Sequence, residues 1–366
     1  MLTATLNATL IICCNQFSIY SFFFLVQHIT SSGTWANKFT LKVLRCARSN
    51  SAYQVNMTCR VMMLLLIILW GVLIDVNGIL SSDTRKLTAY PLLLTHDSAT
   101  GEIDTSRDGI IKDIIDAYSI TQSKGLIDQL KCGARGFDYR PYLLSNGTLI
   151  AHHGSTKVKK LMTESISELK NWAQDNKEEM IILYLSHFDG DDNAEDVCES
   201  ATEKLLQQEN IKYITDCSLL TSMSVMDTYK LGQLNSNSGS IVGIINCINE
   251  NYVSSINCYD WDYTCYGHNS DIPWNQLKNY TISSTNTYHN EMYMSQVHWQ
   301  SDATSVTIGN LHLSSVIEDE QKSGVNQWLL EQINNKALKH VSILEVDNVC
   351  NFGLEIYNSL KKNYNN

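Results

Sequence analysis

The sequence lacks any block of consecutive lysines or arginines, and acidic residues outnumber basic ones. Its 38 Asp and Glu against 27 Lys and Arg give a formal net charge of -11 at pH 7. We therefore expect no nucleic-acid partner, because such proteins need clustered cations to displace counterions from phosphates. The acidic balance also gives no general attraction to anionic membranes, so a lipid substrate would have to be bound through local contacts.

The chain also has few prolines, three in all, and no internal repeat. Its hydrophobic fraction of 44% is ordinary for a globular protein and supplies enough apolar residues for a core. The length of 366 residues exceeds one average domain but falls short of two large ones. A single α/β barrel, which can occupy about 250 residues, is compatible with this length.

No apolar run after Gly78 approaches the length of a membrane span, which is about 20 residues. Before it, residues 61–74 (VMMLLLIILWGVLI) form an unbroken apolar run that follows Arg60 and ends before Asp75. A basic residue, an apolar stretch of this length and then small or polar residues are typical of a secretory signal peptide. We therefore expect a signal peptide at 57–80 and a secreted protein.

The position of this run leaves the start of the protein open. A start at Met57 or Met62 would make residues 1–56 a mis-annotated or disordered leader. A start at Met1 would instead make the apolar stretch at 9–29 the signal or an anchor. The alternative to a signal peptide is that the later apolar run is a buried core helix.

CxxC spacing is absent, which excludes a zinc ribbon. Seven cysteines follow the expected signal, and the odd count leaves one free or paired outside the chain. Cys198–Cys217 and Cys258–Cys265 are the local disulfides that we expect in an oxidising compartment. Sequons at Asn146 and Asn279 are compatible with a glycosylated surface.

Apolar strand-like segments alternate with helical ones from residue 81 onward, which predicts a parallel α/β sheet or barrel spanning 81–366 as one catalytic domain. The region 252–288 is expected to be loop-like. The expected strands are 92–95, 134–142, 149–153, 180–188, 240–247, 292–300 and 340–346. The expected helices are 110–119, 166–176, 194–208, 321–333 and 352–360.

Ionisable side chains gather at the ends of these strands. The carboxyl ends of barrel strands form the active-site face, so we expect these side chains to meet there. Packing alone does not explain so many charged groups delivered by five strands. They are His96, Asp97, Arg140, His153, His187 and Asp347.

Three segments carry a specific resemblance. They are Thr95-His96-Asp97-Ser98, the strand 133–140 (GARGFDYR) and the turn 151–154 (AHHG). In this order and spacing they resemble the motifs of the bacterial-type, metal-independent phosphatidylinositol-specific phospholipases C. The resemblance covers 92–190, the X-type half of that family's domain. It implies a distorted or incomplete (β/α)8 barrel of the phospholipase-C-like phosphodiesterase type.

The family's chemistry implies a role for each matching residue. Cleavage of a phosphodiester through a neighbouring hydroxyl needs a base, an acid and positive charge on the phosphate oxygens. His96 would be the base that activates the inositol 2-hydroxyl, and His153 the acid that protonates the departing diacylglycerol oxygen. Arg140 would hold the phosphate with its planar fork of donors.

Three carboxylates would support this machinery. Asp97 and Asp138 would orient the arginine and the acid histidine. Asp347, after the last strand, is our candidate to fix the tautomer of His96, as an acidic partner does in a catalytic triad.

The strand that carries Arg140 also indicates whether a metal cofactor is needed. Related barrels that use calcium or magnesium carry two or more carboxylates here, because those cations need several oxygen ligands. In Asp138-Tyr139-Arg140 a guanidinium stands where a metal ligand would be expected. We therefore expect no metal and no other cofactor.

Four further residues are candidates for substrate contact. His187 lies where the bacterial enzymes carry lysine, a departure that would lower activity or change its pH range. Gln296, His298 and Trp299 lie on a late strand and could bind or stack on an inositol ring. Arg135 is as well explained by a structural ion pair.

The function predicted from these residues is cleavage of phosphatidylinositol, or of a glycosylated anchor built on it, by a monomer at a membrane surface. Two alternatives remain. One is a metal-dependent glycerophosphodiesterase or sphingomyelinase-D-like barrel, against which Arg140 argues. The other is a secreted binding protein of the same fold with weak or no turnover.

Overall fold

The computed structural model describes residues 79–103, 117–191, 195–250, 272–300 and 314–364. The leader expected at 1–56 and residues 57–78 of the expected signal peptide lie outside this part of the chain. Most of the helix expected at 110–119 also lies outside it. Among the described residues, no helix is both long enough and apolar enough to cross a membrane.

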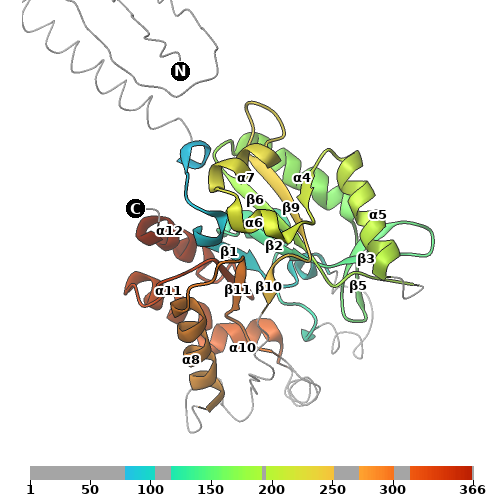
Figure 1. The fold of residues 1–366 in the computed structure, drawn as a ribbon. Helices are drawn as coiled ribbons and strands as arrows, with labels where there is room; N and C mark the ends of the chain where they lie inside the picture. Colours follow the sequence, from blue (N-terminus) through green and yellow to red (C-terminus); the bar gives the residue numbers. More distant parts are fainter. Residues whose placement is uncertain (1–78, 104–116, 192–194, 251–271, 301–313, 365–366) are drawn as a thin grey trace, which may run out of the picture. The chain divides into compact units, whose positions relative to one another are not determined.

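Eight parallel strands form the main sheet, in the order β10-β11-β12-β1-β2-β6-β9-β8 (Figure 1). Within the described residues no pairing joins the edge strands β8 and β10, so the sheet is an open, distorted barrel. The predicted α/β class and incomplete barrel are confirmed. The strands are β1 Leu92–Thr95, β2 Gly136–Tyr139, β6 Met180–Leu185, β8 Lys212–Ile214, β9 Ser240–Ile245, β10 Asn249–Glu250, β11 Tyr293–Gln296 and β12 Ile343–Val346.

The strands of this sheet are buried on both faces, which is why they appear in the sequence as continuous apolar runs. All six residues of β6 and all six of β9 are buried. Alternate residues of β1 belong to two separate apolar clusters: Leu93 packs in one, and Leu92 and Leu94 in the other. The sheet is thus the middle layer between two halves of the core.

A second sheet of four strands, in the order β5-β4-β3-β7, lies in sequence between β2 and α5 and corrects one expectation. The single strand expected at 134–142 is divided: β2 ends at Tyr139, and β3 begins at Pro141. Proline has no N–H for a ladder bond, so the chain leaves the main sheet at Arg140. The strands are β3 Pro141–Leu143, β4 Leu149–His153, β5 Thr156–Leu161 and β7 Asp189–Gly190.

Helices follow most of the strands, as the alternation predicted. The helix expected at 321–333 is divided at Gly324, whose φ of 72° ends α10 and precedes α11. The helices are α3 Leu126–Lys131, α4 Met162–Asp175, α5 Glu195–Gln208, α6 Cys217–Ser222, α7 Val225–Gly232, α8 Ile272–Asn286, α10 Val316–Ser323, α11 Val325–Asn334 and α12 Gly353–Tyr364. Short 3-10 helices are η1 Ile79–Ser82, η2 Leu87–Ala89 and η3 Ser98–Glu102.

Helix α8 corrects the expectation that 252–288 is loop-like. Its proline, Pro273, stands at the second helical position, where a missing N–H costs nothing. Leu277, Thr281 and Thr285 are buried at four-residue spacing and form the packed face. The helix was not predicted because its buried face is partly polar, so the sequence shows no apolar periodicity among the many Asn, Ser and Tyr residues.

The disulfides also differ from expectation. Cys132 pairs with Cys350 and Cys217 with Cys247. The expected Cys198–Cys217 bridge is wrong, because Cys198 is a buried free thiol on α5. Both observed bridges join segments that are distant in the sequence, which local spacing could not reveal. The bridge expected between residues 258 and 265 lies outside the described residues.

Candidate active site

Three neighbouring strands deliver the centre of the site. β1 lies between β12 and β2, and all three run parallel. Their carboxyl ends therefore meet at one edge of the sheet. His96 directly follows β1, Arg140 directly follows β2, and Asp347 directly follows β12. His153 reaches the same place from β4 of the second sheet, rather than from a barrel strand.

Asp97 is the hub of this centre. Its backbone is left-handed, with φ 43° and ψ 49°, a conformation that Asp tolerates better than most residues. Its N–H donates to Asp138 Oδ2 at 3.1 Å, which holds the turn in place. Its carboxylate lies 2.8 Å from Arg140 Nε, 3.2 Å from His96 Nε2 and 3.3 Å from His153 Nε2.

The contacts of the Asp97 carboxylate are ion pairs rather than aligned hydrogen bonds, because no donor points at either oxygen with hydrogen-bond geometry. The side chain is fully buried. Burial opposes its ionisation, but nearby positive charge, that of Arg140 first, outweighs burial and lowers the pKa of Asp97. The site therefore holds a fixed anion at its centre.

Arg140 is held by two carboxylates at once. Its Nε donates to Asp138 Oδ2 at 3.0 Å, and its Nη2 lies 2.9 Å from the same oxygen. Burial opposes its charge, but Asp138 and then Asp97 raise the pKa of Arg140 above its ordinary value. This guanidinium stays charged at every working pH and cannot exchange protons with a substrate.

His153 is oriented by a backbone carbonyl. Its Nδ1 lies 2.8 Å from the carbonyl oxygen of Ser119, which can only accept, so Nδ1 carries a proton. Its Nε2 faces the Asp97 carboxylate, which also only accepts. A proton on Nε2 is compatible with that contact. The side chain is 27% exposed and can give that proton to a bound molecule.

His96 is paired with Asp347. Its Nδ1 lies 2.8 Å from Asp347 Oδ1, which places the ring proton on Nδ1 and leaves Nε2 as the basic nitrogen. Burial lowers the pKa of His96 well below its usual value, and the charge of His298 lowers it further. Burial raises the pKa of Asp347 to about 7. A neutral His96 is the form in which the ring can take up a proton.

A cavity of about 250 Å³ opens over these side chains. It is slightly smaller than the roughly 300–1,000 Å³ of pockets that enclose whole drug-sized ligands. Its volume suits a polar headgroup better than a complete lipid. The lining includes His96, Arg140, His153, His187, Trp299 and Asp347.

Of the four residues expected to contact substrate, two line the cavity and two do not. His187 is exposed, adopts φ 52° and lines the cavity, and its Nδ1 lies 2.8 Å from Ser186 Oγ. Trp299 also lines it, through a largely buried ring whose Nε1 donates to Ser323. Gln296 and His298 are buried behind the cavity and do not line it. Their expected contact with a sugar ring stays a prediction.

A segment without any motif completes the site. Tyr118 and Thr121 line the cavity, and the Ser119 carbonyl orients His153. Thr121 Oγ1 and Gln122 Nε2 both donate to the carbonyl oxygen of His96, at 2.8 and 3.1 Å. The sequence carried no signal for this role, because backbone carbonyls and small hydroxyls are found in any loop.

Among the residues that the structure describes, two groups of side chains come close enough together to be tested as metal sites. His96 is common to both, with His298 and Asp347 in one and with Asp97 and Asp138 in the other. Calcium or magnesium needs several oxygen ligands. The carboxylates here already contact Arg140 or histidine rings, so these donors fit such cations poorly.

The fold and site together define an open parallel α/β barrel with two histidines, an arginine and buried carboxylates at the carboxyl end of its strands. No family model matches the chain. The phosphatidylinositol-specific phospholipase C from Listeria monocytogenes aligns with 78% of this chain and 98% of its own, at 17% identity and a TM-score of 0.51.

The corresponding protein from Staphylococcus aureus is similar too. A form containing pentafluorophenylalanine aligns with 77% of this chain and 96% of its own, at 15% identity and a TM-score of 0.53. A histidine-to-tyrosine variant aligns with 76% and 93%, at 15% identity and a TM-score of 0.50. This chain thus resembles the bacterial phosphatidylinositol-specific phospholipases C in fold.

Proposed function

We propose that this protein is a phosphodiesterase that cleaves phosphatidylinositol, or a glycosylated anchor built on it, to diacylglycerol and an inositol cyclic phosphate without a metal. The observation that carries the proposal is the position of Arg140. It is a permanently charged group in the wall of a headgroup-sized cavity that His96 and His153 also line. The likeness of fold to bacterial phospholipases C is in line with this substrate class.

In the proposed first half of the reaction, His96 Nε2 takes the proton of the inositol 2-hydroxyl. The 2-oxygen then attacks phosphorus and forms the new P–O bond of the cyclic phosphate. Asp347 supports this step by accepting a hydrogen bond from Nδ1–H at 2.8 Å. This hydrogen bond keeps the basic nitrogen, Nε2, toward the cavity. A general base must first point its unprotonated nitrogen at the proton it removes, and only then does its pKa determine the rate.

In the proposed second half, the bond from phosphorus to the glycerol oxygen breaks, and His153 Nε2 gives its proton to that oxygen. The rings of His96 and His153 have centroids 6.3 Å apart, which leaves room for a phosphate between the two proton-transfer groups. Arg140 stabilises the charge on the non-bridging oxygens. Such a preorganised cation is usually the largest single contribution to this kind of catalysis.

Asp97 and Asp138 fix the positions of the reacting groups in this scheme. Asp138 contacts two nitrogens of the Arg140 guanidinium, and Asp97 contacts Arg140 and both histidines. His187 is proposed to meet the phosphate or sugar from the far wall, in place of the lysine expected there. Trp299 offers an apolar surface beside it.

The protein is further proposed to be exported and to work as a monomer on a membrane surface. Two disulfides support an oxidising compartment. The sequon asparagines Asn146 and Asn279 are both exposed, as glycosylation requires. No part of the proposed chemistry needs a second chain.

The test is release of water-soluble label from phosphatidylinositol labelled in the inositol ring, with chelator present. Wild type should turn over, and His96→Ala should lose activity by about 10²–10⁴-fold, the usual contribution of a general base. His340→Ala is the matched control, because His340 is an exposed histidine outside the cavity. It should retain full activity.

The outcomes separate the alternatives. No release by wild type under any condition would leave a binding protein of the same fold. Release that disappears with chelator would favour a metal-dependent glycerophosphodiesterase or sphingomyelinase-D-like enzyme. Full activity in His96→Ala would remove His96 from the base role.

A further inference from the structure

The surroundings of His96 pose a physical problem for a base. Asp347 lies 2.8 Å from its Nδ1, and Asp97 lies 3.2 Å from its Nε2. When they are ionised, two neighbouring carboxylates favour the charged imidazolium. A base, however, must hold its reactive nitrogen without a proton. Something in the structure must therefore oppose the two carboxylates.

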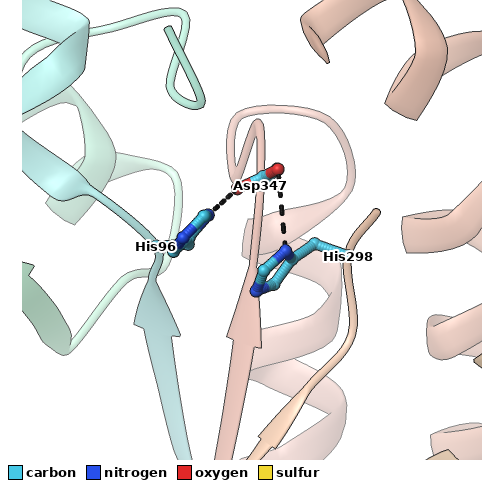
Figure 2. Close-up of side chains that lie close together, drawn as sticks. All are labelled: His96, His298 and Asp347. Carbon is cyan, nitrogen blue, oxygen red and sulfur yellow. Dashed lines mark hydrogen bonds and ion pairs between the residues drawn. The ribbon is translucent and has the colours of Figure 1, made fainter. Parts of the chain in front are cut away.

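His298 lies against the same ring. The two imidazoles are stacked with centroids 4.1 Å apart and planes 15° from parallel. Figure 2 shows His298 on the segment after β11, with the Asp347 carboxylate reaching toward both rings. Asp347 Oδ2 is 3.9 Å from His298 Nδ1. The His298 side chain is fully buried, so water does not screen it from its neighbour.

The partners of His298 bear on which of its ring nitrogens carry protons. Nδ1 lies 3.2 Å from the carbonyl oxygen of Trp299, which can only accept a hydrogen bond. Nε2 lies 3.1 Å from Glu345 Oε2, within β12. With Glu345 ionised, both nitrogens donate and the ring is a cation with its counter-ion on the side away from the Trp299 carbonyl.

We propose that His298 is a positioning residue for the His96 base: held as an imidazolium by Glu345, it lies face to face with the His96 ring and keeps that ring unprotonated. Its consequence for turnover rests on the proposed function, whereas its effect on the His96 ring does not. A cation at this distance destabilises a second positive charge on the stacked ring. It thereby offsets Asp97 and Asp347.

The electrostatics of the whole neighbourhood support this inference. Burial and then His298 lower the pKa of His96, whereas Asp97 and Asp138 act in the opposite direction. Arg140 also lowers it, but less than His298 does. The titratable groups around the stacked pair are Asp97, Asp138, Arg140, His153, Glu320, Glu345 and Asp347.

Glu320, on α10, does not compete for His298. It accepts the Trp299 N–H at 3.0 Å. Burial, and then the charge of Asp347, raise the pKa of Glu320 well above its usual value, so it stays neutral. Glu345 is thus the acid in hydrogen-bond contact with the His298 ring.

The experiment measures the titration of His96 directly. The ring signal of His96 is followed by NMR in protein with labelled histidine and is assigned by its loss from His96→Ala. In His298→Gln the amide can still donate to Glu345 but carries no charge. We expect the midpoint of the His96 titration to rise by roughly 1–2 pH units, the effect of losing one close charge.

The pH profile of turnover gives a second readout. The acid limb of kcat/KM should move upward by the same amount in His298→Gln. Activity on the acid limb should then fall, whereas activity near pH 8 should stay within a few-fold of wild type. If His298 had a purely structural role, kcat/KM would fall at every pH and the position of the acid limb would not change.

Two further variants make the test decisive. Glu345→Gln removes the anion that keeps His298 protonated, so His298 should become neutral. The midpoint of the His96 titration should then rise, as in His298→Gln. This variant supplies the test where His298→Gln fails to fold. His289→Phe is the matched control, because His289 is likewise stacked, on Tyr293 at 3.6 Å, but away from the cavity. It should leave the His96 titration unchanged.

An unshifted His96 midpoint in a folded His298→Gln or Glu345→Gln protein would overturn the inference. This result is independent of the proposed function, because the NMR titration needs no turnover. Conversely, a shifted midpoint in a protein that never cleaves the lipid would support the role of His298 and refute only the function.

Discussion

Two arginines stand at opposite ends of strand β2, five positions apart, and have different surroundings. Arg135, before the strand, donates through Nε to Glu179 at 2.7 Å and through Nη1 to the carbonyls of Leu130 and Ala134. Its guanidinium also lies over the rings of Trp172 and Tyr357. Its Nε, its Nη1 and its guanidinium plane are thus engaged by the fold.

Arg140, after the strand, has similar side-chain exposure, 14% against 10%. Exposure therefore does not separate the two arginines, but their partners do. The carboxylates that hold Arg140, Asp97 and Asp138, belong to the same cluster as His96 and His153, and Arg140 lines the cavity. A buried arginine on its own indicates little; one whose counter-ions also hold titratable rings indicates a site.

The largest effect that would sharpen this comparison is on turnover. In Arg140→Lys the charge remains but the planar fork is lost, so we expect turnover of phosphatidylinositol to fall by about 10²–10³-fold. Thermal unfolding should change little, because the ammonium still pairs with both carboxylates. Turnover within threefold of wild type would remove Arg140 from the proposed mechanism.

The next effect, on stability, is expected at the other end of the strand. Arg135→Lys cannot satisfy Glu179 and two buried carbonyls together, so the free energy of unfolding should fall by about 1–3 kcal/mol. Its turnover should stay near that of wild type. Denaturant unfolding of the two lysine variants side by side checks this. An activity loss in Arg135→Lys equal to that in Arg140→Lys would break the comparison.

The smallest effect concerns pH. Burial raises the pKa of Asp347 from 3.8 to about 7, so the folded state binds more protons than the unfolded one between these values. The contribution of Asp347 to stability is therefore complete below about pH 4 and is lost as pH rises through 7. Between pH 4.5 and 7.5 wild type should lose on the order of 1 kcal/mol or more relative to Asp347→Asn.

The control for this measurement is Asp191→Asn. Hydrogen bonding from Lys157 lowers the pKa of the exposed Asp191 to about 2, so its contribution is lost only as pH falls toward 2. The difference in unfolding free energy between wild type and this control should be constant from pH 4.5 to 7.5. A constant difference for Asp347→Asn as well would contradict the burial argument.

The sequence predicted the parts of this molecule that follow from local patterns. Buried strands give apolar runs, and their polar ends placed His96, Arg140 and Asp347 at one edge of the sheet. The expected approach of Asp347 to His96 is observed at 2.8 Å. The catalytic roles themselves stay predictions until they are measured.

What the sequence could not predict depends on distant contacts. Pairing of Cys132 with Cys350 joins residues 218 positions apart. His298 was expected on a strand spanning 292–300, but β11 ends at Gln296. The stacking of His298 on His96 depends on how two separate strand ends meet, which no pattern within either segment encodes.

The most direct test of the account identifies the first product by phosphorus NMR when wild type acts on phosphatidylinositol with excess chelator. Attack by the inositol 2-hydroxyl, with Arg140 in place of a metal on the phosphate, predicts the signal of an inositol cyclic phosphate that appears as the lipid signal disappears. Phosphatidate or an acyclic inositol phosphate as the first product, or an unchanged lipid that is cleaved once calcium or magnesium is restored, would contradict it.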